Sequence, residues 1–158
     1  LVRNRGVKLD SFLFDDGWDD PQSLWKFHSG FPRGFAPLKE AAARYGAAPG
    51  VWMSPWGGYG NPKKERLQYG TAQGFETNKE GFALSGPIYY KRFRDTCLDM
   101  IRTFGVNQFK FDGVGRARGT VPDRDGRIPN FPETIRIHIR EQIIRTRIAF
   151  LAPPPQEV

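Results

Sequence analysis

A lysine and an aspartate two residues apart are the side chains of this sequence whose arrangement most directly suggests chemistry. Residues 106–112 read VNQFKFD, in which Lys110 and Asp112 alternate with Phe109 and Phe111. Alternate residues of a β-strand share a face, so this spacing predicts both charged side chains on one side of a strand. A nearby cation favours the ionised form of a carboxylate. Asp112 could therefore act as a nucleophile, a base or a metal ligand, or form half of a structural ion pair.

A second acidic group follows another apolar run. Asp15 and Asp16 come directly after residues 8–14 and precede a glycine and Trp18. Carboxylates can accept paired hydrogen bonds from vicinal hydroxyls, and an indole face can pack on the C–H side of a sugar ring. The same residues are also typical of an acidic turn that caps a helix. Their spacing does not match a calcium-binding loop.

Three aromatic residues lie close together in the middle of the chain. Trp52, Trp56 and Tyr59 are interspersed with glycines in the segment VWMSPWGGYG, residues 51–60. Aromatic rings beside glycines can form a platform that lines a ligand pocket. They can equally pack against the rim of a barrel, and the sequence leaves both interpretations open.

The elements that must position these residues alternate between strands and helices. Short apolar runs predict strands at residues 8–14, 50–54 and 106–112, with helices at 37–45 and up to residue 104 between them. This order favours an α/β fold with a parallel sheet, either open or closed into a barrel. In both architectures, ligands bind beyond the carboxyl ends of the strands, where the acidic residues are expected.

The second predicted helix has the clearest periodicity. Its apolar residues recur at helical spacing and are followed by a glycine; they are Phe93, Cys97, Met100, Ile101 and Phe104. Cys97 on this face is expected to be a small core residue. Residues 56–86 form a long connection, which is usually functional or locally folded.

Composition limits the classes of function. The chain has 158 residues, 39% of them hydrophobic, which suits one ordinary domain. One cysteine and two histidines argue against a disulfide framework and against a zinc site. We expect neither a membrane-spanning helix nor a leader peptide. The net charge of +7 and the many aromatic residues leave nucleic-acid binding and carbohydrate binding open.

The character of the sequence changes after residue 115. We predict a first domain at 1–115 and an irregular basic segment at 116–158. That segment contains a loop, an ambiguous helix or strand at 133–151, and a disordered proline-rich tail. Its arginines could bind phosphates, but no nucleic-acid motif is present, which favours a solvated helix face.

Three segments together resemble a known family. FLFDDGW at 12–18, GVWMSPW at 50–56 and NQFKFDG at 107–113 occur in that order with helices between them. They are similar to the catalytic barrel of α-galactosidase-type glycoside hydrolases, the clan of families 27 and 36. The resemblance covers roughly residues 7–115. It implies a partial (β/α)8 TIM barrel, in which the chain supplies strands two to four.

The resemblance also implies roles for individual residues. Asp112 corresponds to the nucleophile of a retaining mechanism, and Lys110 corresponds to a lysine that contacts sugar hydroxyls. Asp15 and Asp16 would hold the hydroxyls of a galactose-like ring, and Trp52 would line the pocket. Together with Trp18, these residues form the expected substrate site, and no metal or cofactor is implied.

Two departures from the family pattern affect the expected function. Ser54 stands where many family 36 members have glutamate before proline, which changes the chemistry of the sugar subsite. The acid/base residue of the clan lies beyond the sixth strand, so we expect an incomplete hydrolase that is inactive alone. The alternatives are a non-catalytic carbohydrate-binding remnant and, less favoured, a basic nucleic-acid-binding domain. The expected partner is a carbohydrate, with no nucleic acid and no membrane. Because a partial barrel leaves its sheet edges open, we also expect the isolated chain to aggregate.

Overall fold

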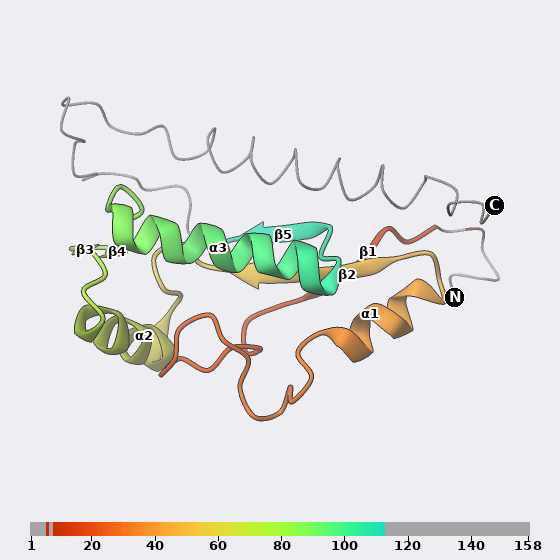
Figure 1. The fold of residues 1–158 in the computed structure, drawn as a ribbon, viewed down its shortest axis with the longest axis horizontal. Helices are drawn as coiled ribbons and strands as arrows, with labels where there is room; N and C mark the ends of the chain where they lie inside the picture. Colours follow the sequence, from red (N-terminus) through yellow and green to blue (C-terminus); the bar gives the residue numbers. More distant parts are fainter. Residues whose placement is uncertain (1–5, 7, 113–158) are drawn as a thin grey trace, which may run out of the picture.

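The computed structural model describes residue 6 and residues 8–112, which form a mixed α/β unit (Figure 1). Residues 116–158, expected to form a basic loop, helix and tail, lie outside the described residues. The elements, in chain order, are β1 Ser11–Phe14, α1 Ala36–Ala43, β2 Ala48–Met53, α2 Gly60–Ala72, β3 Thr77–Asn78, β4 Gly81–Phe82, α3 Pro87–Phe104 and β5 Gln108–Phe111.

A small parallel sheet forms the centre of the unit. Its strand order is β1-β2-β5, and both neighbouring pairs are parallel. Trp52 of β2 is in register with Lys110 of β5, and Phe14 of β1 is in register with Val51. The predicted mixed α/β class and parallel strands are thus observed. Three parallel strands are compatible with an open sheet or with a segment of a barrel.

Helix α3 covers one face of this sheet (Figure 1). Its buried residues include Phe93, Cys97, Met100 and Ile101, as the apolar periodicity predicts. Phe93 contacts Phe111 of β5 with ring centroids 5.7 Å apart. The Cys97 thiol is fully enclosed, and its burial raises its pKa, consistent with a structural role.

Aromatic side chains dominate the core. Trp18, Trp25 and Phe35 are each at most 3% exposed and lie in the long segment between β1 and α1. They pack on one another and on Phe27, with ring centroids 4.9 to 6.2 Å apart in the pairs that link them. This segment is therefore part of the core, although it contains almost no regular secondary structure.

The connection at 56–86 is locally folded. It contains α2 and the short β3–β4 hairpin, and α2 lies near the carboxyl end of the sheet (Figure 1). The buried residues of α2 are Arg66 and Gly70 rather than an apolar stripe. The absence of that stripe explains why periodicity does not predict this helix.

The sheet has two edges in the part of the chain that the structure describes. No other strand there pairs with the outer sides of β1 and β5. Phe12, Leu13 and Phe14 of β1 are 37 to 43% exposed, and they line a groove of about 330 Å³ against α1. No helix between residues 8 and 112 is long and apolar enough to cross a membrane.

Candidate functional site

Asp15, Asp16 and Asp112 all follow strands of the parallel sheet at its carboxyl edge. Asp15 and Asp16 follow β1, and Asp112 follows β5. The Asp112 backbone N–H donates to the Met53 carbonyl at 3.0 Å, which extends the pairing of β5 with the end of β2. Parallel pairing therefore places residues separated by about a hundred positions at one edge, as the sequence predicts.

The Asp112 carboxylate accepts a hydrogen bond on each oxygen. Trp52 Nε1 donates to Oδ2 at 3.1 Å, and the Tyr59 hydroxyl donates to Oδ1 at 3.0 Å. The hydrogen bond to Asp112 is the main reason why the pKa of Tyr59 is raised, since the phenol must remain protonated to donate. Two donors from different elements fix the orientation of this carboxylate.

Lys110 forms an ion pair across the sheet. Its Nζ lies 2.7 Å from Asp15 Oδ2, although β2 separates the strands that carry the two residues. The hydrogen bond from Lys110 lowers the pKa of Asp15, and the same bond is the main cause that raises the pKa of Lys110. The nearby Asp112 charge raises the pKa of Lys110 to a smaller extent. The sequence spacing suggested a pair between Lys110 and Asp112, whereas in the structure Lys110 forms its ion pair with Asp15 and has Asp112 as a nearby charge.

Asp16 is held by a buried arginine that sequence reasoning missed. Arg66 Nη2 lies 3.0 Å from Asp16 Oδ1 and 2.6 Å from Asp19 Oδ1, and Nε donates to Asp19 Oδ2 at 3.0 Å. Burial alone would lower the pKa of Arg66, but the hydrogen bonds and the negative charges of Asp19 and Asp16 together outweigh burial and raise it. The acidic group after β1 thus has two separate cationic partners, Lys110 and Arg66.

The two tryptophans that were expected to contact sugar are buried. Trp18 is 0% exposed and Trp52 is 1% exposed. The Trp18 indole N–H donates to the Trp52 carbonyl at 2.8 Å, and its ring packs among core aromatics. Trp52 reaches the site through its indole N–H alone. Tyr59 is 57% exposed and is therefore the aromatic ring beside Asp112 that a ligand could contact.

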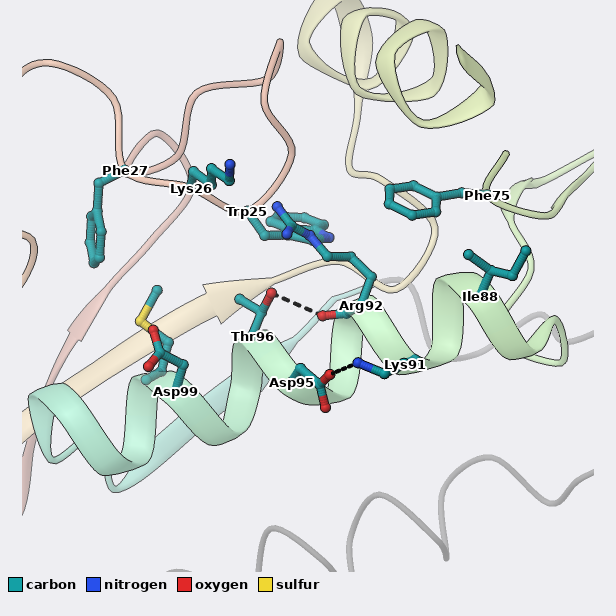
Figure 2. A pocket seen from close by; sticks show the side chains of 11 residues that line it. Trp25, Lys26, Phe27, Phe75, Ile88, Lys91, Arg92, Asp95, Thr96 and Asp99 are labelled. Carbon is teal, nitrogen blue, oxygen red and sulfur yellow. Dashed lines mark hydrogen bonds and ion pairs between the residues drawn. The ribbon is translucent and has the colours of Figure 1, made fainter. Parts of the chain in front are cut away.

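An outer cavity lies between α3 and the segment that connects β1 to α1 (Figure 2). It has a volume of about 600 Å³ and includes Trp25, Lys26 and Arg92 among its lining residues. Arg92 Nη2 donates to the carbonyls of Ser23 and Leu24 at 3.2 and 2.7 Å. None of the six predicted site residues lines this cavity.

The carboxyl edge of the sheet offers oxygen and nitrogen groups suited to hydroxyl recognition. Asp15 and Lys110 expose 59% and 43% of their side chains, so both can exchange hydrogen bonds with a ligand. Asp112 provides an oriented carboxylate beside them. Within the described ranges, no group of three or more His, Cys, Asp or Glu side chains is arranged to hold a metal ion. No protein-family model matches the chain, and no curated protein matches it significantly.

Proposed function

We propose that this chain carries the nucleophile side of a retaining glycoside hydrolase site for terminal α-galactoside-like sugars, with Asp112 as the nucleophile. The observation that supports the proposal is the double hydrogen bonding of Asp112 at the edge where Asp15, Asp16 and Lys110 also gather. The resemblance of the three motifs to α-galactosidases supplies the sugar class.

In this reaction, an Asp112 oxygen attacks the anomeric carbon while the bond to the leaving oxygen breaks. The product is a covalent glycosyl ester, which water later hydrolyses with net retention. Trp52 and Tyr59 hold the carboxylate plane so that an oxygen faces the sugar. Asp15 and Lys110 bind ring hydroxyls, and Trp18 and Trp52 support the site from the core.

The leaving oxygen must receive a proton from a second carboxyl group about 5–5.5 Å from the nucleophile. Lys110 lowers the pKa of Asp15 and keeps it ionised, so Asp15 is a poor proton donor. The carboxylates of Asp16 and Asp19 are already paired with the guanidinium of Arg66. The proposal therefore assigns proton donation to a group outside this carboxylate cluster.

The local charge favours a neutral sugar over a phosphate. The cluster contains four carboxylates, those of Asp15, Asp16, Asp19 and Asp112, and its cations are Lys110 and Arg66. The phosphate backbone of a nucleic acid would meet net negative charge at this edge, even though the whole protein chain carries +7. This difference argues against nucleic-acid binding at the site.

The direct test traps the covalent intermediate on the full chain. The probe is a 2,4,6-trinitrophenyl 2-deoxy-2,2-difluoro-α-galactoside, whose leaving group departs without protonation and whose fluorines slow hydrolysis of the ester. Intact mass and peptide mapping should find one sugar on Asp112. Asp112→Asn should not be labelled, whereas Asp99→Asn, on the exposed face of α3, should react like the original chain.

A non-catalytic carbohydrate-binding function is the second candidate. It is favoured by the engagement of Asp15, Asp16 and Asp19 with cations, which leaves these carboxylates suited to binding rather than to proton transfer. Calorimetric binding of galactose without labelling of Asp112 would establish this alternative and reject the hydrolase proposal. Labelling that persists in Asp112→Asn would also reject Asp112 as the nucleophile.

A further inference from the structure

Arg66 lies between the loops that form the candidate site. It is 1% exposed and projects from the middle of α2. Its guanidinium makes hydrogen bonds to Asp16 and Asp19 from the loop after β1, and Nη1 donates to the Gly57 carbonyl at 3.0 Å. One side chain therefore joins α2 to the loops that follow β1 and β2.

Arg66 also contacts the first hydrogen-bond donor of Asp112. Its Cζ lies 5.6 Å from the ring centroid of Trp52 and 5.0 Å from that of Trp25. A guanidinium over an indole face is attracted by the negative charge of the π-system. Since Trp52 Nε1 donates to Asp112, this contact restrains the ring that supplies the donor.

The second donor, Tyr59, follows a loop that packs on the same guanidinium. Gly58 has φ +88, and a Cβ atom there would lie 2.5 Å from Arg66 Nη1 and 3.2 Å from Trp52 Cη2. This close approach and positive φ require glycine at position 58. Tyr59 is the next residue, so the position of its hydroxyl depends on the seating of the loop on Arg66.

We propose that Arg66 is a positioning residue that holds two hydrogen-bond donors of Asp112, the Trp52 indole and the Tyr59 hydroxyl, in place. The planar guanidinium of Arg66 is essential to this role because it donates four separate hydrogen bonds in fixed directions. A lysine would keep the charge but could not reproduce these directions.

The proposal predicts a specific change at Trp52 in Arg66→Lys. The readout is hydrogen exchange of the Trp52 indole N–H, measured by ¹H–¹⁵N NMR on the full chain without any sugar. Loosening a hydrogen bond to a charged acceptor should accelerate this exchange by at least about tenfold. Arg92→Lys is the matched control, because Arg92 also binds backbone carbonyls but belongs to the outer cavity (Figure 2).

Two results would overturn the proposal. One is unchanged Trp52 exchange in a folded Arg66→Lys chain, and the other is equal acceleration in Arg92→Lys. If Arg66→Lys does not fold, Asp16→Ala removes one partly exposed acceptor of the Arg66 guanidinium and should still accelerate Trp52 exchange. Unchanged exchange in that variant would also overturn the proposal.

The catalytic consequence rests on the proposed function. If Asp112 is the nucleophile, Arg66→Lys should slow its labelling by the difluorogalactoside by at least about tenfold, with Arg92→Lys unaffected. Absence of labelling in the original chain would reject the hydrolase while leaving the exchange measurement intact. The two failures are therefore distinguishable.

Discussion

Two cation–carboxylate pairs at the same edge of the sheet differ in burial and in the number of hydrogen bonds. Arg66 and Asp19 have side chains that are 1% and 0% exposed, and two hydrogen bonds join them. Lys110 and Asp15 have side chains that are 43% and 59% exposed and share one hydrogen bond at 2.7 Å. Water can replace the partner in the second pair but not in the first.

This difference in burial indicates that the Arg66–Asp19 pair has a structural role and that the Lys110–Asp15 pair belongs to a binding surface. A buried charge that loses its partner is strongly destabilising, whereas an exposed ion pair contributes little to stability. We therefore expect Arg66 and Asp19 to hold the loops together, and Lys110 and Asp15 to exchange their mutual hydrogen bond for sugar hydroxyls. The following substitutions test this division, beginning with the largest expected effect.

Arg66→Met should destabilise the chain by about 3–5 kcal/mol, because it leaves the Asp19 carboxylate buried and unpaired. Chemical denaturation measures the loss. The double variant Arg66→Met, Asp19→Leu removes both charges and should recover much of it. A loss below about 1 kcal/mol in the single variant would show that the pair does not organise the loops.

Gly58→Ala should cost more stability than Gly17→Ala. Both glycines have positive φ, at +88 and +107, so both alanines carry backbone strain of about 1–2 kcal/mol. At Gly58 the new Cβ would also press on Arg66 and Trp52, whereas at Gly17 no atom lies within 4 Å. Equal unfolding free energies for the two variants would argue that the loop is not seated on Arg66.

Lys110→Met should leave the unfolding midpoint within experimental error but weaken galactose binding. The loss of a charge-assisted hydrogen bond to a hydroxyl predicts at least about tenfold weaker affinity by calorimetry. Lys91→Met is the control, since Lys91 forms a similar exposed pair with Asp95 on α3, at 2.7 Å. Equal affinity in the Lys110 and Lys91 variants would remove Lys110 from the site.

The smallest effect concerns pH. Lys110 lowers the pKa of Asp15, so the pair stabilises the fold above the ordinary pKa of Asp15, and this contribution disappears as pH falls through the lowered value. At high pH, the contribution is lost as pH rises through the raised pKa of Lys110. A ¹³C titration should show the Asp15 pKa rising in Lys110→Met. An unchanged Asp15 pKa would contradict the ion pair.

The parts of the fold that depend on local apolar pattern could be predicted from the sequence. Continuous apolar runs indicate β1 and β2, and helical spacing indicates α3 up to its left-handed cap at Gly105. Parallel connection of these elements then brings Asp15 and Asp112 to one edge. These predictions require only the spacing of apolar residues and the rule that the carboxyl ends of parallel strands lie at the same edge of a sheet.

The connections within the site could not be predicted in this way. Arg66 is buried in a helix without an apolar stripe, so its role depends on Asp16 and Asp19, about fifty residues away. Lys110 binds Asp15 across the intervening strand, whereas spacing along one strand suggested Asp112. Tyr59 lies among glycines that suggested a platform, and its hydrogen bond to Asp112 depends on the loop geometry.

The central claim is that a neutral hexose binds where Asp112, Lys110 and Tyr59 meet. NMR titration of the full chain with galactose tests it most directly, using the Trp52 indole N–H as a reporter inside the site and the Arg92 Nε–H as a reporter at the outer cavity. We expect saturable shifts at Trp52 that Lys110→Met weakens, with Arg92 unchanged. Shifts at Arg92 with none at Trp52 would contradict it.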